Sequence, residues 1–293
     1  MNAIETKGLT KSYGKSRGIN NLDLIVKQGE FFGFIGPNGA GKSTTIRTLL
    51  NLIFKTSGET KIFGLDCEKD SKKIKELIGF VPSEVNYYKH MRVSELLNYA
   101  ISFKKTPDKD RLDYLCKLLD VDKDKKISDL SLGNKKKIAI IQAIINKPKL
   151  LILDEPTNGL DPLIQKRLFK LLKEENENGM TIFFSSHNLV EVQKFCDKVA
   201  IIKEGKLIGI KTIGDLLGKD TVKVIIESDD SLDEIITSKE VSNPKQEDNT
   251  TSFLYNGNIN SLINKLNTIN LNSLKIENPS LEESFMSYYE EDC

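Results

Sequence analysis

Hydrophobic residues occur along the first 215 positions in short, nearly uninterrupted runs, each about as long as one β-strand. Residues 31–35, 150–153 and 181–184 are almost wholly apolar, as strands are when both faces of a parallel sheet are buried. Residues 45–54 and 164–175 instead have the apolar spacing of helices. Strands that alternate with helices predict an α/β fold, a mostly parallel sheet with helices on both faces.

Two other regions of the first 215 residues depart from this alternation. Residues 4–35 have the pattern of successive strands. Residues 94–99 and 111–116 have helical spacing with Pro107 between them as a breaker, and residues 138–145 form a strongly apolar helix. We therefore expect a helical subdomain over about residues 86–148.

The composition changes near Leu216, where acidic residues and asparagine become frequent. The tail has its own predicted strands and helices, at residues 221–226, 251–255, 258–267 and 280–289. Residues 243–249 are expected to be an exposed loop. The pattern divides the chain into a domain over residues 1–215 and a small α+β appendage over residues 216–293. The appendage can brace a dimer, regulate it or recognise a partner, and the sequence leaves this open.

The charge is divided in the same way as the composition. The whole chain has a net charge of +1, with 39% hydrophobic and 29% charged residues, which is ordinary for a globular protein with a sizeable core. Residues 216–293 hold 6 lysines and 15 acidic residues, a net charge of −9, which leaves +10 for residues 1–215. The larger domain is therefore suited to attract phosphates or polyanions, although charged, solvated surfaces explain the same numbers.

Cysteine usage and hydropathy bear on the compartment. The 4 cysteines are far apart and fit no metal or redox spacing, so we expect reduced thiols in a cytosolic protein. The N-terminus lacks a basic-then-apolar signal sequence, and no apolar run approaches the roughly 20 residues that span a bilayer. Any link to a membrane is then expected to go through a partner.

The segment GPNGAGKST, residues 36–44, matches the phosphate-loop pattern G-x-x-x-x-G-K-[ST] between a predicted strand and a predicted helix. Small residues let successive backbone N–H groups surround phosphate oxygens, and the following helix presents its positive end. Lys42 can reach the outer phosphates, and the Ser43 hydroxyl can ligate Mg²⁺. A flexible glycine turn is the alternative interpretation. The candidate nucleotide-binding residues are Gly36, Asn38, Gly39, Ala40, Gly41, Lys42, Ser43 and Thr44.

Two consecutive carboxylates, Asp154 and Glu155, end the buried strand at residues 150–153. Asp154 can hold Mg²⁺ directly or through water, while Glu155 points elsewhere, toward the position of an attacking water. Acids with separate roles suit metal-dependent phosphoryl transfer. Two surface acids at a strand end are the alternative.

A histidine and a small helix cap complete the candidate chemistry. His187 follows the strand at residues 181–184, on the edge where α/β sheets bind ligands, and can donate to a γ-phosphate. Ser131 is a predicted helix N-cap in Leu130-Ser131-Leu132-Gly133-Asn134, and with Gly133 it offers a second phosphate-binding surface. Structural roles, a core histidine and simple helix capping, remain open for both.

Residues 1–215 resemble the ATP-binding subunit of an ABC transporter. The resemblance lies in five segments that occur in this order: GPNGAGKST, LSLGN, LLILDEP, GLDP and SSH. The resemblance implies a P-loop ATPase core with an antiparallel β subdomain and a helical subdomain. It implies ATP and Mg²⁺ as cofactors and a head-to-tail dimer, a homodimer or a pseudo-symmetric heterodimer, that sandwiches two ATP. Each nucleotide would contact the phosphate loop of one chain and Ser131 and Gly133 of the other.

The same resemblance assigns roles to individual residues. Glu155 would be the general base, with Lys42 and His187 as further catalytic residues at the γ-phosphate. Asp161 would cross the dimer interface, and Tyr13 would stack on the adenine. The alternative for Tyr13 is an ordinary tyrosine at a strand end.

The chain departs from the family pattern at two places. Ser83 stands after the predicted strand at residues 78–82 where the family usually has a glutamine that contacts Mg²⁺ or the water. Leu132 and Asn134 replace a glycine and a glutamine of the signature, while Ser131 and Gly133 are kept. These departures and the tail are similar to ATPases of the drug and bacteriocin exporter branch, bacitracin-type exporters among them.

The resemblance therefore implies an ATP-hydrolysing subunit that drives separately encoded membrane permease subunits. We expect it to be cytoplasmic and peripheral on the inner face of the cell membrane. An exporter of a drug, peptide or lipid-like substrate is the expected type, with no nucleic-acid partner. A soluble ABC ATPase acting on ribosomes or DNA is the alternative. Its support is the basic domain with Lys135-Lys136-Lys137, which we interpret as a solvated helix face. A module that binds ATP without hydrolysis is a third hypothesis, supported only by Ser83.

Overall fold

The computed structural model describes the chain except residues 15, 105, 218–220, 268 and 280–293. The chain separates into two compact units, Met1–Ile210 and Lys211–Cys293. The helix expected at residues 280–289 lies outside the described residues.

A six-stranded sheet forms the centre of the first unit, with the strand order β10-β9-β3-β8-β7-β6. Its strands are β3 (Phe31–Ile35), β6 (Ile78–Val81), β7 (Leu150–Asp154), β8 (Thr181–Ser186), β9 (Lys198–Lys203) and β10 (Lys206–Thr212). The pairings β9–β3, β3–β8, β8–β7 and β7–β6 are all parallel. Every residue of β3, β7 and β8 is buried, which confirms the α/β prediction from the apolar runs.

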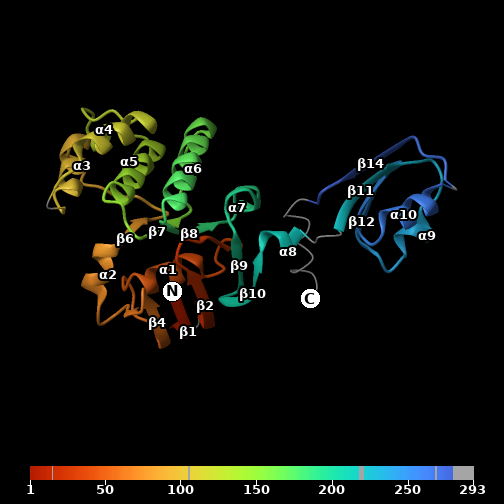
Figure 1. Cartoon of the computed structure of the whole chain (residues 1–293), viewed down its shortest axis with the longest axis horizontal. Helices are drawn as coiled ribbons and strands as arrows, with labels where there is room; N and C mark the ends of the chain where they lie inside the picture. The colour runs from red at the N-terminus through yellow and green to blue at the C-terminus, as the bar shows by residue number, and fades with distance from the viewer. Residues whose placement is uncertain (15, 105, 218–220, 268, 280–293) are drawn as a thin grey trace. The chain divides into compact units, whose positions relative to one another are not determined.

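Layers cover both faces of this sheet (Figure 1). Helix α1 (Lys42–Leu49) lies on one side, together with a second, antiparallel sheet of order β2-β1-β4-β5. The strands of that sheet are β1 (Asn2–Tyr13), β2 (Ser16–Lys27), β4 (Ser57–Ile62) and β5 (Leu65–Asp66). Helices α5 (Leu132–Ile144) and α6 (Pro162–Glu177) lie on the other side.

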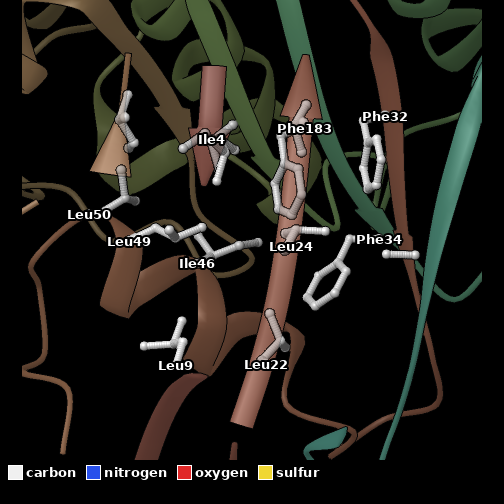
Figure 2. Packing of buried hydrophobic residues seen from close by; sticks show 14 of the residues in the cluster. Ile4, Leu9, Leu22, Leu24, Phe32, Phe34, Ile46, Leu49, Leu50 and Phe183 are labelled. Atoms are coloured by element: carbon white, nitrogen blue, oxygen red, sulfur yellow. The ribbon is translucent and has the colours of Figure 1, made fainter. Parts of the chain in front are cut away.

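Alternate side chains of the central strands pack into these two layers. Phe34 and Phe183 join the core shared with α1 and the second sheet, their ring centroids 5.4 Å apart (Figure 2). Phe184, the next residue of β8, instead packs edge-on against Phe169 of α6 at 5.6 Å. The central strands are thus buried on both faces, and their parallel pairing places the carboxyl ends of β3, β7 and β8 beside one another.

The helical subdomain contains α3 (Val93–Ile101), α4 (Lys109–Leu118) and α5, with a break between α3 and α4 that includes Pro107, as predicted. Helix α5 starts at Leu132, six positions before the apolar run that predicted it, because Ser131 caps it by accepting from the Asn134 N–H at 3.2 Å. Helices α2 (Ser71–Leu77) and α7 (Leu189–Phe195) complete the unit.

The helix predicted at residues 45–54 was placed too far along the chain. Helix α1 spans Lys42–Leu49, and Asn51 beyond it has a left-handed φ of 52°. The apolar side chains of Leu52 and Phe54, which suggested continuation, are 55% and 71% exposed. Hydrophobic spacing extended across the turn although the backbone had already left the helix.

The second unit contains an antiparallel sheet of order β12-β13-β11-β14 with short helices. Its elements are α8 (Ile213–Leu217), β11 (Thr221–Glu227), α9 (Asp233–Ile236), β12 (Val241–Glu247), β13 (Thr250–Asn256), α10 (Ile259–Leu266) and β14 (Ser273–Glu277). Val224, Phe253 and Tyr255 of the sheet pack with Leu262 and Leu266 of α10 in a separate core. The strands and the helix predicted within residues 221–267 are confirmed.

The loop predicted at residues 243–249 is wrong, because most of it belongs to strand β12. Pro244 suggested a loop, since proline cannot donate to a neighbouring strand. Strand β12 lies at the edge of its sheet, and its register with β13 shifts between Ser242 and Lys245, around the proline. An edge position with an irregular register tolerates the missing donor.

None of the helices in the described part of either unit combines the length and the apolar character needed to cross a bilayer.

Candidate nucleotide site

The loop after β3 has the backbone that a phosphate cradle requires. Gly39 and Gly41 adopt left-handed φ values of 80° and 111°, and Gly41 directly precedes α1. A Cβ at Gly36 would lie 2.3 Å from the carbonyl oxygen of Ile202, so only glycine fits there. The loop is also fixed from outside, because the Gly205 N–H donates to the Ala40 carbonyl at 2.9 Å.

Lys42 joins this loop to the carboxylate at the end of β7. Its ammonium donates to the carbonyls of Gly36 and Pro37 at 2.7 and 3.2 Å and lies 3.2 Å from Glu155 Oε1. The two charged side chains are only 6% and 10% exposed. Such a buried pair holds both charges in a defined geometry. Ser43 and Thr44, next in the chain, are half-buried in the first turn of α1.

The two consecutive carboxylates, Asp154 and Glu155, contact different side chains. Asp154 is buried and accepts from the Ser185 hydroxyl at 2.7 Å through Oδ1. Glu155 has a left-handed φ of 50°, so the chain turns sharply between the two residues. Its Oε2 lies 2.5 Å from Nδ1 of His187 and 3.2 Å from the Asn158 amide. The single carboxylate of Glu155 therefore contacts both the Lys42 ammonium of the loop and His187 after β8.

The segments after β7 and β8 are joined by a second buried carboxylate. Glu191 of α7 accepts from the hydroxyls of Thr157 and Ser186 at 3.2 and 3.4 Å. Burial raises the pKa of Glu191 above its usual value, and the hydrogen bonds from the two hydroxyls offset only part of this effect. The contact fixes the chain beside His187, whose own side chain is 49% exposed.

The exposed Ser131 and Asp161 and the half-buried Gly133 form a neighbouring surface. A Cβ at Gly133 would lie 2.3 Å from the Gly159 carbonyl oxygen, so the start of α5 packs directly on the segment that precedes α6. Ser131 and Asp161 are exposed, and each caps a helix, Asp161 by accepting from the Ile164 N–H at 3.0 Å. The contacts of these residues are with each other's segments and not with the phosphate loop of their own chain.

Tyr13 is the last residue of β1, in the β1–β2 hairpin. The ring is 45% exposed, and the Lys11 ammonium lies 5.1 Å from its centroid. Ile19 of the same hairpin is next to Gly41, because a Cβ at that glycine would lie 2.9 Å from its side chain. Tyr13 thus has a partly exposed aromatic face on the hairpin whose Ile19 approaches the phosphate loop.

The prediction that the lysine run at residues 135–137 forms a solvated helix face is wrong. Lys136 and Lys137 are only 4% and 6% exposed. Lys136 donates to the carbonyl of Ser83 at 2.6 Å and to that of Glu155 at 3.3 Å. The missed signal was helical spacing, since Lys136 stands four residues before the buried Ile140 on the same helix face.

These contacts place a glycine-rich loop, its lysine and a carboxylate pair at the carboxyl edge of a parallel sheet. The arrangement defines a P-loop nucleotide-binding protein.

Comparison with known proteins identifies the family. The ABC transporter family matches over residues 19–158. The bacitracin transport ATP-binding protein of Bacillus licheniformis is 40% identical over 208 residues, 70% of this chain and 68% of that protein. The linearmycin resistance ATP-binding protein of Bacillus subtilis is 33% identical over 311 residues, 97% of either chain, and so spans both units. The dimeric structure of a bacterial ABC transporter cassette has a TM-score of 0.66 at 26% identity, covering 72% of this chain and 99% of that one.

The chain belongs to the family of ABC transporter ATP-binding proteins. The resemblance seen in its motifs, including that to bacitracin-type ATPases, is confirmed.

Proposed function

We propose that this chain is the ATP-hydrolysing subunit of an exporter, driving separately encoded membrane permeases through ATP-dependent head-to-tail dimerisation. The observation that carries the proposal is Glu155, whose carboxylate contacts both Lys42 and His187. A base held between a phosphate-loop lysine and a histidine suits hydrolysis of a bound triphosphate. The names of the bacitracin and linearmycin relatives support export of a drug or peptide-like substrate.

ATP fits the loop, because a cradle built on left-handed Gly39 and Gly41 directs backbone N–H groups at phosphate oxygens. Lys42 would bind the outer phosphates and thereby release Glu155 to orient the attacking water. His187 holds Glu155 through Nδ1, which leaves Nε2 to face the γ-phosphate.

Mg²⁺ also fits the residues present. The described residues contain no cluster of three or more His, Cys, Asp or Glu side chains, so the protein would supply few ligands. The Ser43 hydroxyl and Asp154 Oδ2 are oxygen donors of the kind that Mg²⁺ takes when phosphates complete its shell. The ion would neutralise charge on those phosphates. Ser83, half-buried, would reach it only through water.

The second nucleotide surface would come from another copy or a related chain. Ser131 and Asp161 each cap their own helix and remain exposed. Both would therefore be accessible to a nucleotide bound by a partner. The dimeric state of the matching cassette supports this arrangement.

A groove of about 1370 Å³ offers the docking site for the permease. It lies among α2, β6, α3 and α5 and is lined by apolar and aromatic side chains such as Phe80, Tyr87, Tyr99 and Phe103. Tyr99 and Phe103 are 60% and 70% exposed. An amphipathic cytoplasmic helix of a permease fits such a groove, which would hold the chain at the inner face of the membrane.

Affinity capture tests this function. Tagged Glu155→Gln protein would be recovered from gently solubilised cells with ATP, beside a Tyr99→Ser/Phe103→Ser form of the same variant. We expect a multi-span membrane protein with the first and its loss from the second, while both still dimerise with ATP. Recovery of ribosomes or nucleic acid with no membrane protein would instead support a soluble role. The burial of Lys136 and Lys137 argues against that outcome.

The phosphate loop gives a first prediction. Gly41→Ala places a side chain at φ 111° and its Cβ 2.9 Å from Ile19, which shifts the N–H groups of the cradle. We expect the Kd for ATP to rise about tenfold, measured with a fluorescent ATP analogue. Gly179→Ala is the matched control, because φ there is 95° with nothing within 4 Å. It should cost about 1 kcal/mol of stability and leave the Kd unchanged. Equal effects on the Kd would refute the role of the loop.

Tyr13 gives a second prediction. Tyr13→Ala removes an aromatic face that would stack on adenine, a contact of about 1–3 kcal/mol. We expect the Kd for ATP to rise about tenfold while the Kd for inorganic tripolyphosphate stays the same. Tyr13→Phe should bind ATP as the wild type does. A loss of affinity for both ligands would contradict stacking on the base.

A further inference from the structure

Lys136 of α5 connects two segments that lie outside its own helix, the one after β6 and the one after β7. It lies on α5, is 4% exposed, and its ammonium donates to the carbonyls of Pro82, Ser83 and Glu155 at 2.9, 2.6 and 3.3 Å. A lysine ammonium has three hydrogens and no acceptor, so these three carbonyls use its full capacity. One nitrogen atom thus bridges the segment after β6 to the residue after β7.

The bridge reaches Glu155 at its strained backbone. Glu155 has a left-handed φ of 50°, a conformation that persists only when neighbouring groups hold it. Its N–H donates to the Ser185 carbonyl at 3.2 Å, and its carbonyl accepts from Lys136. Both backbone groups are therefore fixed from other elements. Loss of the Lys136 contact would let the peptide after Glu155 rotate and move the carboxylate from its place between Lys42 and His187.

The bridge also reaches the docking groove. Pro82 and Glu84 line the groove, and Ser83 stands between them. The contact that Ser83 makes with Lys136 uses its backbone carbonyl and not its side chain. Lys136 is the group that continues this contact to Glu155. A segment entering the groove and shifting residues 82–84 would therefore pull on the ammonium that holds the base.

Burial lowers the pKa of Lys136 below its usual value, and the nearby carboxylates of Asp154 and Glu155 offset only part of this effect. A neutral glutamine has two amide hydrogens and cannot reach all three carbonyls.

We propose that Lys136 is a positioning residue that couples the groove segment at residues 82–84 to the base Glu155. The proposal rests on the proposed function, in which Glu155 orients the attacking water and a permease occupies the groove. Lys136 itself contacts no reacting atom. Its removal should therefore change turnover and local backbone order while ATP binding persists.

The test uses the full chain with Lys136→Met and Lys136→Gln, and Lys137→Met as a control. Lys137 is also buried on α5, but its ammonium donates to the distant Asp120 carbonyl at 3.4 Å. We expect Lys136→Met to lower kcat at least about tenfold and to change the Kd for ATP less than about twofold. Amide exchange in peptides covering residues 82–86 and 155–159 should accelerate about tenfold, with that of residues 138–144 unchanged. The kcat and the exchange rates of Lys136→Gln should lie between those of the wild type and Lys136→Met. Those of Lys137→Met should match the wild type.

Unchanged exchange in either peptide would overturn the proposal, even with a lower kcat. Faster exchange along the whole of α5 would also overturn it, because that result marks Lys136 as a packing residue only. A wild type that hydrolyses no ATP would refute the proposed function instead. The exchange measurement, which needs no turnover, would still decide whether Lys136 holds both segments.

Discussion

Glu155→Gln should reduce ATP turnover by about 100- to 1,000-fold, the loss expected when a general base is removed. The amide has the shape of the carboxylate but cannot accept a proton from the attacking water. Binding should persist, because Lys42 keeps its contacts with the Gly36 and Pro37 carbonyls and the cradle keeps its backbone. Phosphate release measures the turnover. Size-exclusion chromatography with light scattering should show an ATP-dependent dimer that the wild type forms only transiently.

Glu175→Gln provides the control for this result. Glu175 is a half-buried glutamate of the same unit, with a side chain 13% exposed and paired with Arg111 at 2.7 Å, but it lies on α6 and not in the loop. The Glu175→Gln protein should have a lower free energy of unfolding than the wild type and the same rate of ATP turnover. Wild-type hydrolysis by the Glu155→Gln protein would exclude Glu155 as the base. Equal losses in both variants would mean that turnover follows stability alone.

The central sheet was predictable because its strands carry a strong signal. Residues 31–35, 150–153 and 181–184 are apolar at nearly every position, and the structure buries all of β3, β7 and β8. Helix termini were harder, because apolar spacing does not reveal where the backbone changes. Asn51 ends α1 by its left-handed φ, and Ser131 starts α5 by a cap. The strand through Pro244 depended on an edge position that only the assembled sheet defines.

The residues of the site were predictable, but their contacts were not. Each motif follows a strand, so the sequence predicted that the phosphate loop, Glu155 and His187 meet at one edge. The strand order places β8 between β3 and β7, and so brings His187 at the end of β8 beside the ends of the strands that carry the loop and Glu155. That order is not contained in any motif. The burial of Lys136 was missed for a related reason, since three adjacent lysines have the composition of a solvated surface.

Lys42→Met should raise the Kd for ATP about 100-fold. The change removes a cation that would make two charge-assisted hydrogen bonds to phosphates, each worth about 1.5 kcal/mol. Methionine keeps the linear shape, so the start of α1 should remain intact. Titration with a fluorescent ATP analogue checks the affinity. Lys198→Met is the control, because Lys198 pairs with Glu30 at 2.7 Å in the same unit and is not in the loop. Wild-type affinity in Lys42→Met would exclude the proposed phosphate contact.

Lys42→Met also leaves Glu155 as a buried carboxylate without its cation. The resulting loss of stability can be measured without nucleotide. Adding Glu155→Gln removes the stranded charge, so the double variant should be more stable than Lys42→Met alone. We expect a coupling energy of about 1–3 kcal/mol, from hydrogen exchange of the β3 and β7 amides in a double-mutant cycle. A coupling near zero would show that the contact at 3.2 Å contributes little to stability. A large coupling would mean that ATP, by engaging Lys42, must break a stabilising pair. Binding would then release the base at the moment when a phosphate is present.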